Sequence, residues 1–197
     1  LEELAPAARA LAAGNAGGAL WRPALAALLA ELGLVEQAAR ELEHVRREGL
    51  EGLRQGLWLG SLTYLTDACA AIGDRDVAAL IYPELAAYEG GNVVIGYSVA
   101  FYGATDRYLG MLAATLGDRE RAQRHFAAAH ELNRRTGAAT WLARGCYEHG
   151  RMLAEAGEHA DAQPFLEEAS ALAEERGLGS LLARVRAVRR AGEPVRR

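Results

Sequence analysis

The chain has 197 residues, a formal net charge of −4 and a pI near 5.8, so it lacks the overall positive field that attracts nucleic acid or an anionic membrane. Apolar residues make up 51% of the sequence and charged residues 24%, which is typical of a domain that buries a hydrophobic core. No apolar stretch is long enough to span a bilayer or follows a charged leader of the signal-peptide type. We therefore expect a cytoplasmic protein without direct contact to nucleic acid or membrane.

Two sets of glycines predict where helices end. The first set closes segments in which apolar residues recur three and four apart, and its members are separated by 40, 44 and 40 residues: Gly33, Gly73, Gly117 and Gly157. The second set closes the segments that follow: Gly49, Gly90, Gly137 and Gly177. Because glycine has no Cβ, it adopts the left-handed conformation that ends a helix with little strain. The order helix, tight turn, helix, turn is therefore expected to repeat along the chain.

The expected elements, in chain order, are all helices, and no strand is predicted. A first helix is expected near 2–13, and helix pairs follow near 18–32 and 34–48, 57–72 and 74–88, 98–116 and 118–136, and 138–156 and 158–176. These pairs define repeats of approximately 18–49, 57–90, 98–137 and 138–177, and a capping helix near 178–191 completes a single domain over 1–197. Pro83 and Pro164 fall inside second helices, where they should kink or locally unwind the helix.

Positions at a fixed distance from the first glycine set alternate between small and large side chains. Seven residues before each glycine the side chain is small: Ala26, Thr66, Gly110 and Gly150. Five residues after it stands an alanine, and nine residues after it a large side chain: Ala38, Ala78, Ala122 and Ala162, then Leu42, Tyr82, Phe126 and Leu166. Joined helices approach to about 8–10 Å where small side chains meet and a large one fills the adjacent space. We therefore expect an all-α fold, a right-handed superhelical solenoid of about four antiparallel helix pairs with terminal helices.

These positions carry a family likeness. The pattern Leu109-Gly110 … Gly117 … Ala122 … Phe126 … Ala129 resembles the tetratricopeptide signature, and Gly150 … Gly157 … Ala162 … Ala169 repeats it. The likeness is strong over 98–177 and weaker over 18–90, and its period of about 40 residues exceeds the usual 34. Repeats of this length, with the segments RYLGMLAATLGD and EGGNVVIG, resemble the C-terminal helical region of actinobacterial signalling ATPases. These ATPases are either LuxR-type transcription regulators of the MalT-like class or class III cyclases with an ATPase module. The resemblance implies a sensor or scaffold arm.

Motifs for nucleotide chemistry are missing. All 22 basic residues are arginines, so the lysine of a P-loop cannot be supplied. The glycine-rich segment 90–96 has no predicted strand before it, as a dinucleotide-binding loop would require. We interpret this segment as a loop between repeats, with contact to a ligand as the alternative.

Cysteine and histidine spacing favours no active site. Cys146 and His149 are one helical turn apart and could form a thiol–imidazole dyad, but His149 occupies a position that is leucine in the other repeats, so we expect it to face a neighbouring helix. His125 and His130 point to different helix faces, which argues against zinc. The only other cysteine, Cys69, is distant in the sequence. We therefore expect no catalytic residues, no metal and no cofactor.

The first helix of each pair is expected to line the concave side of a helical-repeat stack. Seven residues should face this groove: Thr63, Asp67, Arg107, Met111, Arg144, Tyr147 and Arg151. Arginines beside an aromatic ring suit a carboxylate, a phosphate or an acidic peptide. The alternative is a solvated face on which Arg144 pairs with Glu148 and Arg151 with Glu155, four residues apart.

The leading hypothesis is a non-catalytic module for protein interaction or sensing. The sequence begins at Leu1 rather than at methionine, so we expect it to belong to a longer bacterial signalling or transcription regulator whose other domains, or a separate protein or peptide, are its partners. One alternative is a sensor for a small anionic ligand in the arginine-lined groove. Another is an oligomerisation scaffold, in which one end of the stack binds a second copy.

Overall fold

The computed structural model of this chain describes residues 18–55, 57–96 and 100–192, together with Pro6. Apart from Pro6, the helix expected near 2–13 lies outside the described residues. The described helices, in chain order, are α2 Gly18–Glu31, α3 Val35–Glu48, the short 3₁₀ helix η1 Glu51–Gln55, α4 Trp58–Ile72, α5 Arg75–Ala86, α6 Thr105–Leu116, α7 Arg119–Arg135, α8 Ala139–Glu155, α9 His159–Glu175 and α10 Gly179–Ala191. In this part of the chain, none of the helices is both long and apolar enough to cross a membrane.

The helix ends follow from the turn glycines and from acidic caps. All eight glycines of the two sets have a positive φ, between 66° and 82°. This is the conformation expected where glycine ends a helix. At the starts of α5 and α7, Asp74 and Asp118 accept hydrogen bonds from the backbone N–H of Val77 and Arg121, both at 3.1 Å. These carboxylates satisfy N–H groups that have no partner within the helix.

A β-hairpin interrupts the helical series, so the prediction of no strand was wrong. Strands β1, Asn92–Ile95, and β2, Ala100–Ala104, pair antiparallel, with Ile95 opposite Ala100. The segment 90–96 is therefore a turn followed by a strand rather than a plain loop, and the helix expected from residue 98 begins at Thr105. Two local features explain the difference. Val93 and Ile95 are buried while Val94 between them is exposed, as in a strand, and Gly103 has a φ of 75°, which a helix does not allow.

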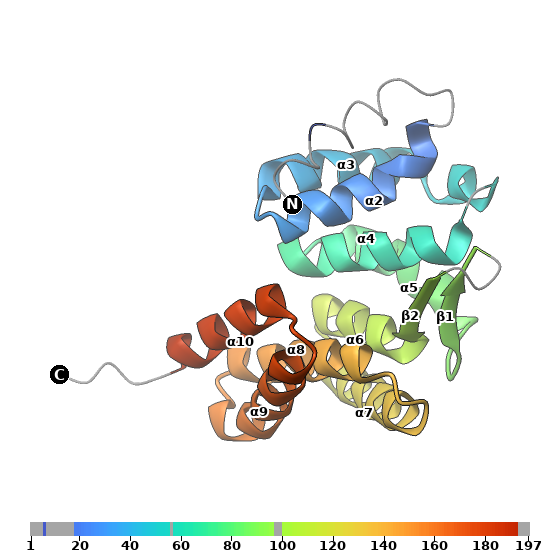
Figure 1. Cartoon of the computed structure of the whole chain (residues 1–197). Helices are drawn as coiled ribbons and strands as arrows, with labels where there is room; N and C mark the ends of the chain where they lie inside the picture. Colours follow the sequence, from blue (N-terminus) through green and yellow to red (C-terminus); the bar gives the residue numbers. More distant parts are fainter. Residues whose placement is uncertain (1–5, 7–17, 56, 97–99, 193–197) are drawn as a thin grey trace.

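Helices within each pair pack together, and so do the first helices of successive pairs. The contacts of the first helices join α2 to α4, α4 to α6 and α6 to α8, and α8 also contacts α10; α5 contacts α6 and α7 contacts α8 as well. Figure 1 shows α2 and α3 at one end of the series, α6 and α7 after the hairpin, and α8 to α10 at the other end. One hydrophobic core extends from α2 to α7, and a second one joins α8, α9 and α10.

The small positions predicted from the repeat lie where paired helices approach most closely. A Cβ added to Gly110 of α6 would lie 2.9 Å from the ring of Phe126 in α7. One added to Gly150 of α8 would lie 2.8 Å from Leu166 in α9. Ala38, Ala78, Ala122 and Ala162 are all buried. The alternation of small and large side chains therefore sets the separation of these helix pairs.

Candidate functional site

A cavity of about 590 Å³ lies between the first helices of the pairs and the last helix. Side chains from α2, α4, α6, α8 and α10 line it, so segments from nearly the whole described chain meet there. Six of the seven residues expected in the groove are among them: Asp67, Arg107, Met111, Arg144, Tyr147 and Arg151. Thr63 is not, because it is fully buried and its hydroxyl donates to the Gly60 carbonyl at 2.8 Å.

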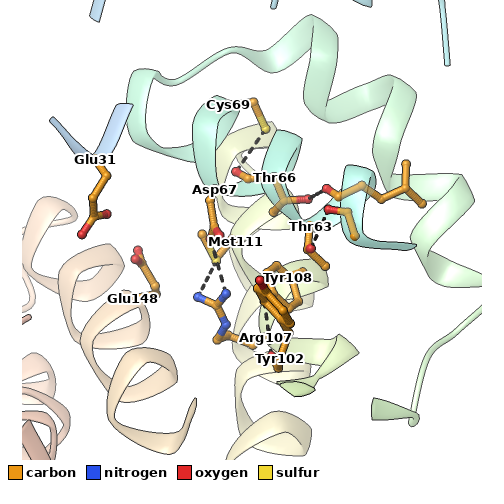
Figure 2. Close-up of polar contacts among 12 residues, drawn as sticks. Glu31, Thr63, Thr66, Asp67, Cys69, Tyr102, Arg107, Tyr108, Met111 and Glu148 are labelled. Atoms are coloured by element: carbon orange, nitrogen blue, oxygen red, sulfur yellow. Dashed lines mark hydrogen bonds and ion pairs between the residues drawn. The ribbon is translucent and has the colours of Figure 1, made fainter. Parts of the chain in front are cut away.

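Arg107 extends from α6 towards α4 at one side of this cavity (Figure 2). The residue is only 1% exposed. Its Nη2 donates to Asp67 Oδ1 at 3.3 Å, its Nη1 donates to the Met111 sulfur at 3.4 Å, and its guanidinium carbon lies 4.0 Å from the centre of the Tyr108 ring. Its Nε–H is buried and has no hydrogen-bond partner among the described residues. Arg107 is thus a buried cation with one long ion pair and one weak sulfur acceptor.

Among the described residues, Asp67 of α4 is the one carboxylate that forms an ion pair with Arg107. Its side chain is 35% exposed, on the side that faces the cavity. Burial raises the pKa of Asp67, and the nearby Arg107 opposes that rise. The ion pair between Asp67 and Arg107 therefore offsets only part of the cost of burying their charges.

Arg144 of α8 has no ion pair within the ranges that the structure describes. The expected pairing of Arg144 with Glu148 is not formed, because Glu148 binds Arg151 and Arg184 instead. The guanidinium carbon of Arg144 lies 5.7 Å from the centre of the Trp141 ring, and that of Arg107 lies 5.6 Å from the same centre. One indole ring therefore lies close to both arginines, at a distance that allows weak cation–π attraction.

The other two arginines of the cavity are held by carboxylates. Arg151 donates to Glu148 at 3.1 Å and to Glu155 at 2.7 Å, the second being the pair expected from the sequence. Arg184 of α10 contacts Glu31 of α2 at 2.9 Å and Glu148 at 3.4 Å. This chain of ion pairs joins α2, α8 and α10 across the cavity. Sequence reasoning missed Arg184 and Glu31, which are 153 residues apart.

The hairpin positions the aromatic side of the site. Tyr102 of β2 stacks on Trp141, with ring centres 5.2 Å apart. Its hydroxyl lies 2.7 Å from that of Tyr64, which lines the cavity. A Cβ on Gly103 would lie 2.5 Å from Trp141, so glycine is required there for this approach. The hairpin thus holds the indole ring beside Arg107 and Arg144.

The candidate thiol–imidazole dyad is absent among the contacts of the described residues. His149 contacts His130, with Nδ1 and Nε2 3.3 Å apart, and the Cys146 sulfur lies 3.5 Å from Glu168 and 3.9 Å from His130. Burial raises the pKa of the Cys146 thiol, and the Glu168 carboxylate raises it further. A protonated thiol is a poor nucleophile, so these surroundings do not activate Cys146.

A second polar cluster contains the one group of potential metal ligands in the described residues. The donor atoms of Glu89, Asp106 and His125 lie within 4.8 Å of one another. Both nitrogens of His125 are already hydrogen-bonded, Nδ1 to Asp106 at 2.8 Å and Nε2 to the Tyr82 hydroxyl at 2.8 Å. Asp106 also accepts from the N–H of Gly90 at 2.8 Å. This chain of hydrogen bonds ties α5, α6, α7 and the turn before β1 together.

We predict that Tyr82→Phe lowers the free energy of unfolding by about 1 kcal/mol, because the partner of His125 Nε2 is removed while the ring is retained. Urea unfolding at pH 7 measures the change. Tyr88→Phe is the matched control, since Tyr88 lies exposed on the turn after α5, and it should change stability by less than about 0.5 kcal/mol. Equal effects of the two substitutions would contradict a structural role for the hydrogen bonds that link Tyr82, His125 and Asp106.

Comparisons with models of known protein families, with curated proteins and with solved structures find no match.

Proposed function

We propose that this chain is a non-catalytic binding module, a right-handed solenoid of tetratricopeptide-like helix pairs that holds a ligand in its concave side. The observation that carries the proposal is the convergence of α2, α4, α6, α8 and α10 on one cavity. Its volume, about 590 Å³, falls in the range of small-molecule sites, which is roughly 300–1,000 Å³. A small ligand therefore suits the cavity better than a long peptide does.

The position of the cavity supports a role in sensing. A ligand would contact the first helix pair and the last helix at once, through α2 and α10, so its binding energy would act on their relative position. In a multidomain bacterial regulator, which the sequence resembles, such a module would report occupancy of the cavity to neighbouring domains. The arginines and the carboxylates that line the cavity provide binding contacts, and no reaction is assigned to them.

The test is a fragment screen by two-dimensional NMR on the chain and on Ala27→Trp. Ala27 lines the cavity from α2, so an indole there should occupy the space and abolish fragment binding. In the unsubstituted chain, fragments should shift amides of α4, α6 and α8. Ala127→Trp is the matched control, because Ala127 is exposed on α7 and does not line the cavity.

Two results would refute the proposal. One is the absence of any fragment that shifts cavity amides in the unsubstituted chain. The other is hydrolysis or cyclisation of nucleoside triphosphates by the chain alone, which a non-catalytic module does not perform.

A further inference from the structure

The cavity contains a buried cation whose hydrogen-bonding capacity is largely unused. A guanidinium has five N–H donors, and burying one without acceptors is costly. Arg107 has one carboxylate oxygen at 3.3 Å, one thioether sulfur at 3.4 Å and an Nε–H without a partner in the described part of the chain. In Figure 2 its guanidinium extends into the space bordered by Asp67, Met111 and Glu148. An additional anion at this point would satisfy donors that the protein leaves unpaired.

The charges around the cavity specify the charge of that anion. The cavity is lined by four arginines and three carboxylates: Arg107, Arg144, Arg151 and Arg184, with Glu31, Asp67 and Glu148. Glu155 pairs with Arg151 from outside the lining, so four carboxylates balance four arginines in total, and the local unpaired charge is that of Arg144, which has no carboxylate partner among the described residues. A singly charged anion neutralises it, whereas a phosphate dianion or a strongly acidic peptide would meet three carboxylates at close range. The lining therefore favours a monoanion.

Existing ion pairs show which arginines have donors left for a ligand. Arg151 and Arg184 are engaged by Glu148, Glu155 and Glu31 at distances from 2.7 to 3.4 Å. Arg144 has no carboxylate partner within the described residues, and it shares the Trp141 ring with Arg107. The available donors are thus those of Arg107 and Arg144, on neighbouring helices.

The part of the cavity that α2 lines is mainly apolar, apart from Glu31, which Arg184 holds. Helix α2 presents Ala24, Ala27, Leu28 and Ala30 to it. A ligand with its charge at Arg107 and Arg144 would therefore place the rest of its body against aliphatic side chains. Burial of that body adds affinity without requiring further polar contacts.

We infer that Arg107 and Arg144 form the anion subsite of this cavity, and that its ligand is a small organic monocarboxylate with an apolar body. The inference rests on the proposed binding function and names the chemistry of its ligand. A carboxylate is preferred among monoanions because its two coplanar oxygens match the parallel N–H donors of a guanidinium.

The experiment is calorimetric titration of the chain with 3-phenylpropionate and with 3-phenylpropanamide, its uncharged counterpart of similar shape. The acid should bind at least about 10-fold more tightly than the amide, as expected for hydrogen bonds to a charged group. In Arg144→Gln this preference should fall below about 3-fold, since that variant removes an unpaired cation without leaving a carboxylate orphaned. Arg186→Gln is the matched control, because Arg186 is exposed on the same helix as Arg184 and outside the cavity, and it should retain the preference.

A direct readout of Arg107 accompanies the titration. Its Nε–H resonance, identified by its loss in Arg107→Lys, should shift when the acid binds and remain in place with the amide. If acid and amide bind equally and Ala27→Trp blocks both, the carboxylate subsite is refuted while the binding function stands. Failure of the acid to bind, or tighter binding of inorganic phosphate or of an acetylated Asp-Glu dipeptide amide, would also refute the subsite.

Discussion

Lowering the pH from 7 to 5 should reduce the free energy of unfolding by about 2–4 kcal/mol, because burial lowers the pKa of two histidines, His130 and His149, to about 4. Both side chains are almost inaccessible, at 3% and 6% exposure. For His130, the neighbouring His149 and Arg134 add to the effect of burial. The charged form of either ring is therefore disfavoured in the folded protein.

The sign follows from proton uptake. The unfolded chain binds protons at these histidines below a pH of about 6.5, whereas the folded chain does so only near pH 4. Their contribution to stability is complete above about pH 6.5, and it is lost progressively as the pH falls to about 4. Acidification in this window thus favours the unfolded state.

The surroundings of the pair explain why the rings remain neutral. His149 lies between Phe126 and Phe165, with ring centres 5.1 and 4.0 Å away. His130 stacks at 6.4 and 5.8 Å from the same two phenylalanines. A positive charge here would be surrounded mainly by aromatic carbon, without the hydration that it has in the unfolded chain.

Urea unfolding at pH 7 and pH 5 measures the loss, and two variants separate its cause. His149→Leu introduces the residue found at this position in the other repeats, and it should reduce the loss by roughly half. Leu42→Ala removes buried apolar volume from α3, away from the histidine pair, and no titratable group, so it should lower stability by the same amount at both pH values. An unchanged pH dependence in His149→Leu would show that the histidine pair does not cause it.

The second large effect is expected at the closest approach of α6 and α7. Gly110→Val should lower the free energy of unfolding by about 2–3 kcal/mol, because its side chain would meet the buried ring of Phe126. The ring cannot withdraw easily, since it stacks against His130 and His149. Thermal or urea unfolding at pH 7 gives the measurement.

The matched control is another helical glycine. A Cβ on Gly179, at the start of α10, would have no neighbour within 4 Å, so Gly179→Val should change stability by less than about 1 kcal/mol. Combining Gly110→Val with Phe126→Leu should restore part of the lost stability, because the smaller leucine side chain leaves room for the valine. Equal losses for Gly110→Val and Gly179→Val would mean that the helices are not this close.

The helices could be predicted because their ends are encoded locally. The glycines that end them and the carboxylates that cap them act within a few residues, and α8 and α9 begin and end within one residue of the expected ranges. The hairpin was missed because its two strands have only weak local signals in the sequence. The run Asn92–Ile95 is only four residues long, and its partner strand mixes Phe101 and Tyr102, which favour strands, with alanine and glycine, which do not. The left-handed Gly103 is the one local sign against a helix there.

The sequence predicted the groove residues of α4, α6 and α8, but not those that α2 and α10 contribute. Asp67, Met111 and Arg151 each stand six residues before a glycine of the first set, so periodicity alone places them on one face. The contributions of α2 and α10 depend on how rotation accumulates along the series of pairs, which no local pattern encodes. For that reason the partners of Glu148 were misassigned. An i,i+4 pair with Arg144 was considered, whereas Arg184 arrives from a distant helix.

The most direct test is whether α4, α8 and α10 surround one cavity in solution. A nitroxide label on Ala71→Cys would lie at the α4 side of the cavity, and Cys69 and Cys146 are buried and poorly accessible to the reagent. Paramagnetic broadening should then reach the amides of Tyr147 in α8 and Arg184 in α10, and it should spare Glu167 on the exposed side of α9. Sharp signals for both Tyr147 and Arg184 would contradict the shared cavity on which the proposed binding function depends.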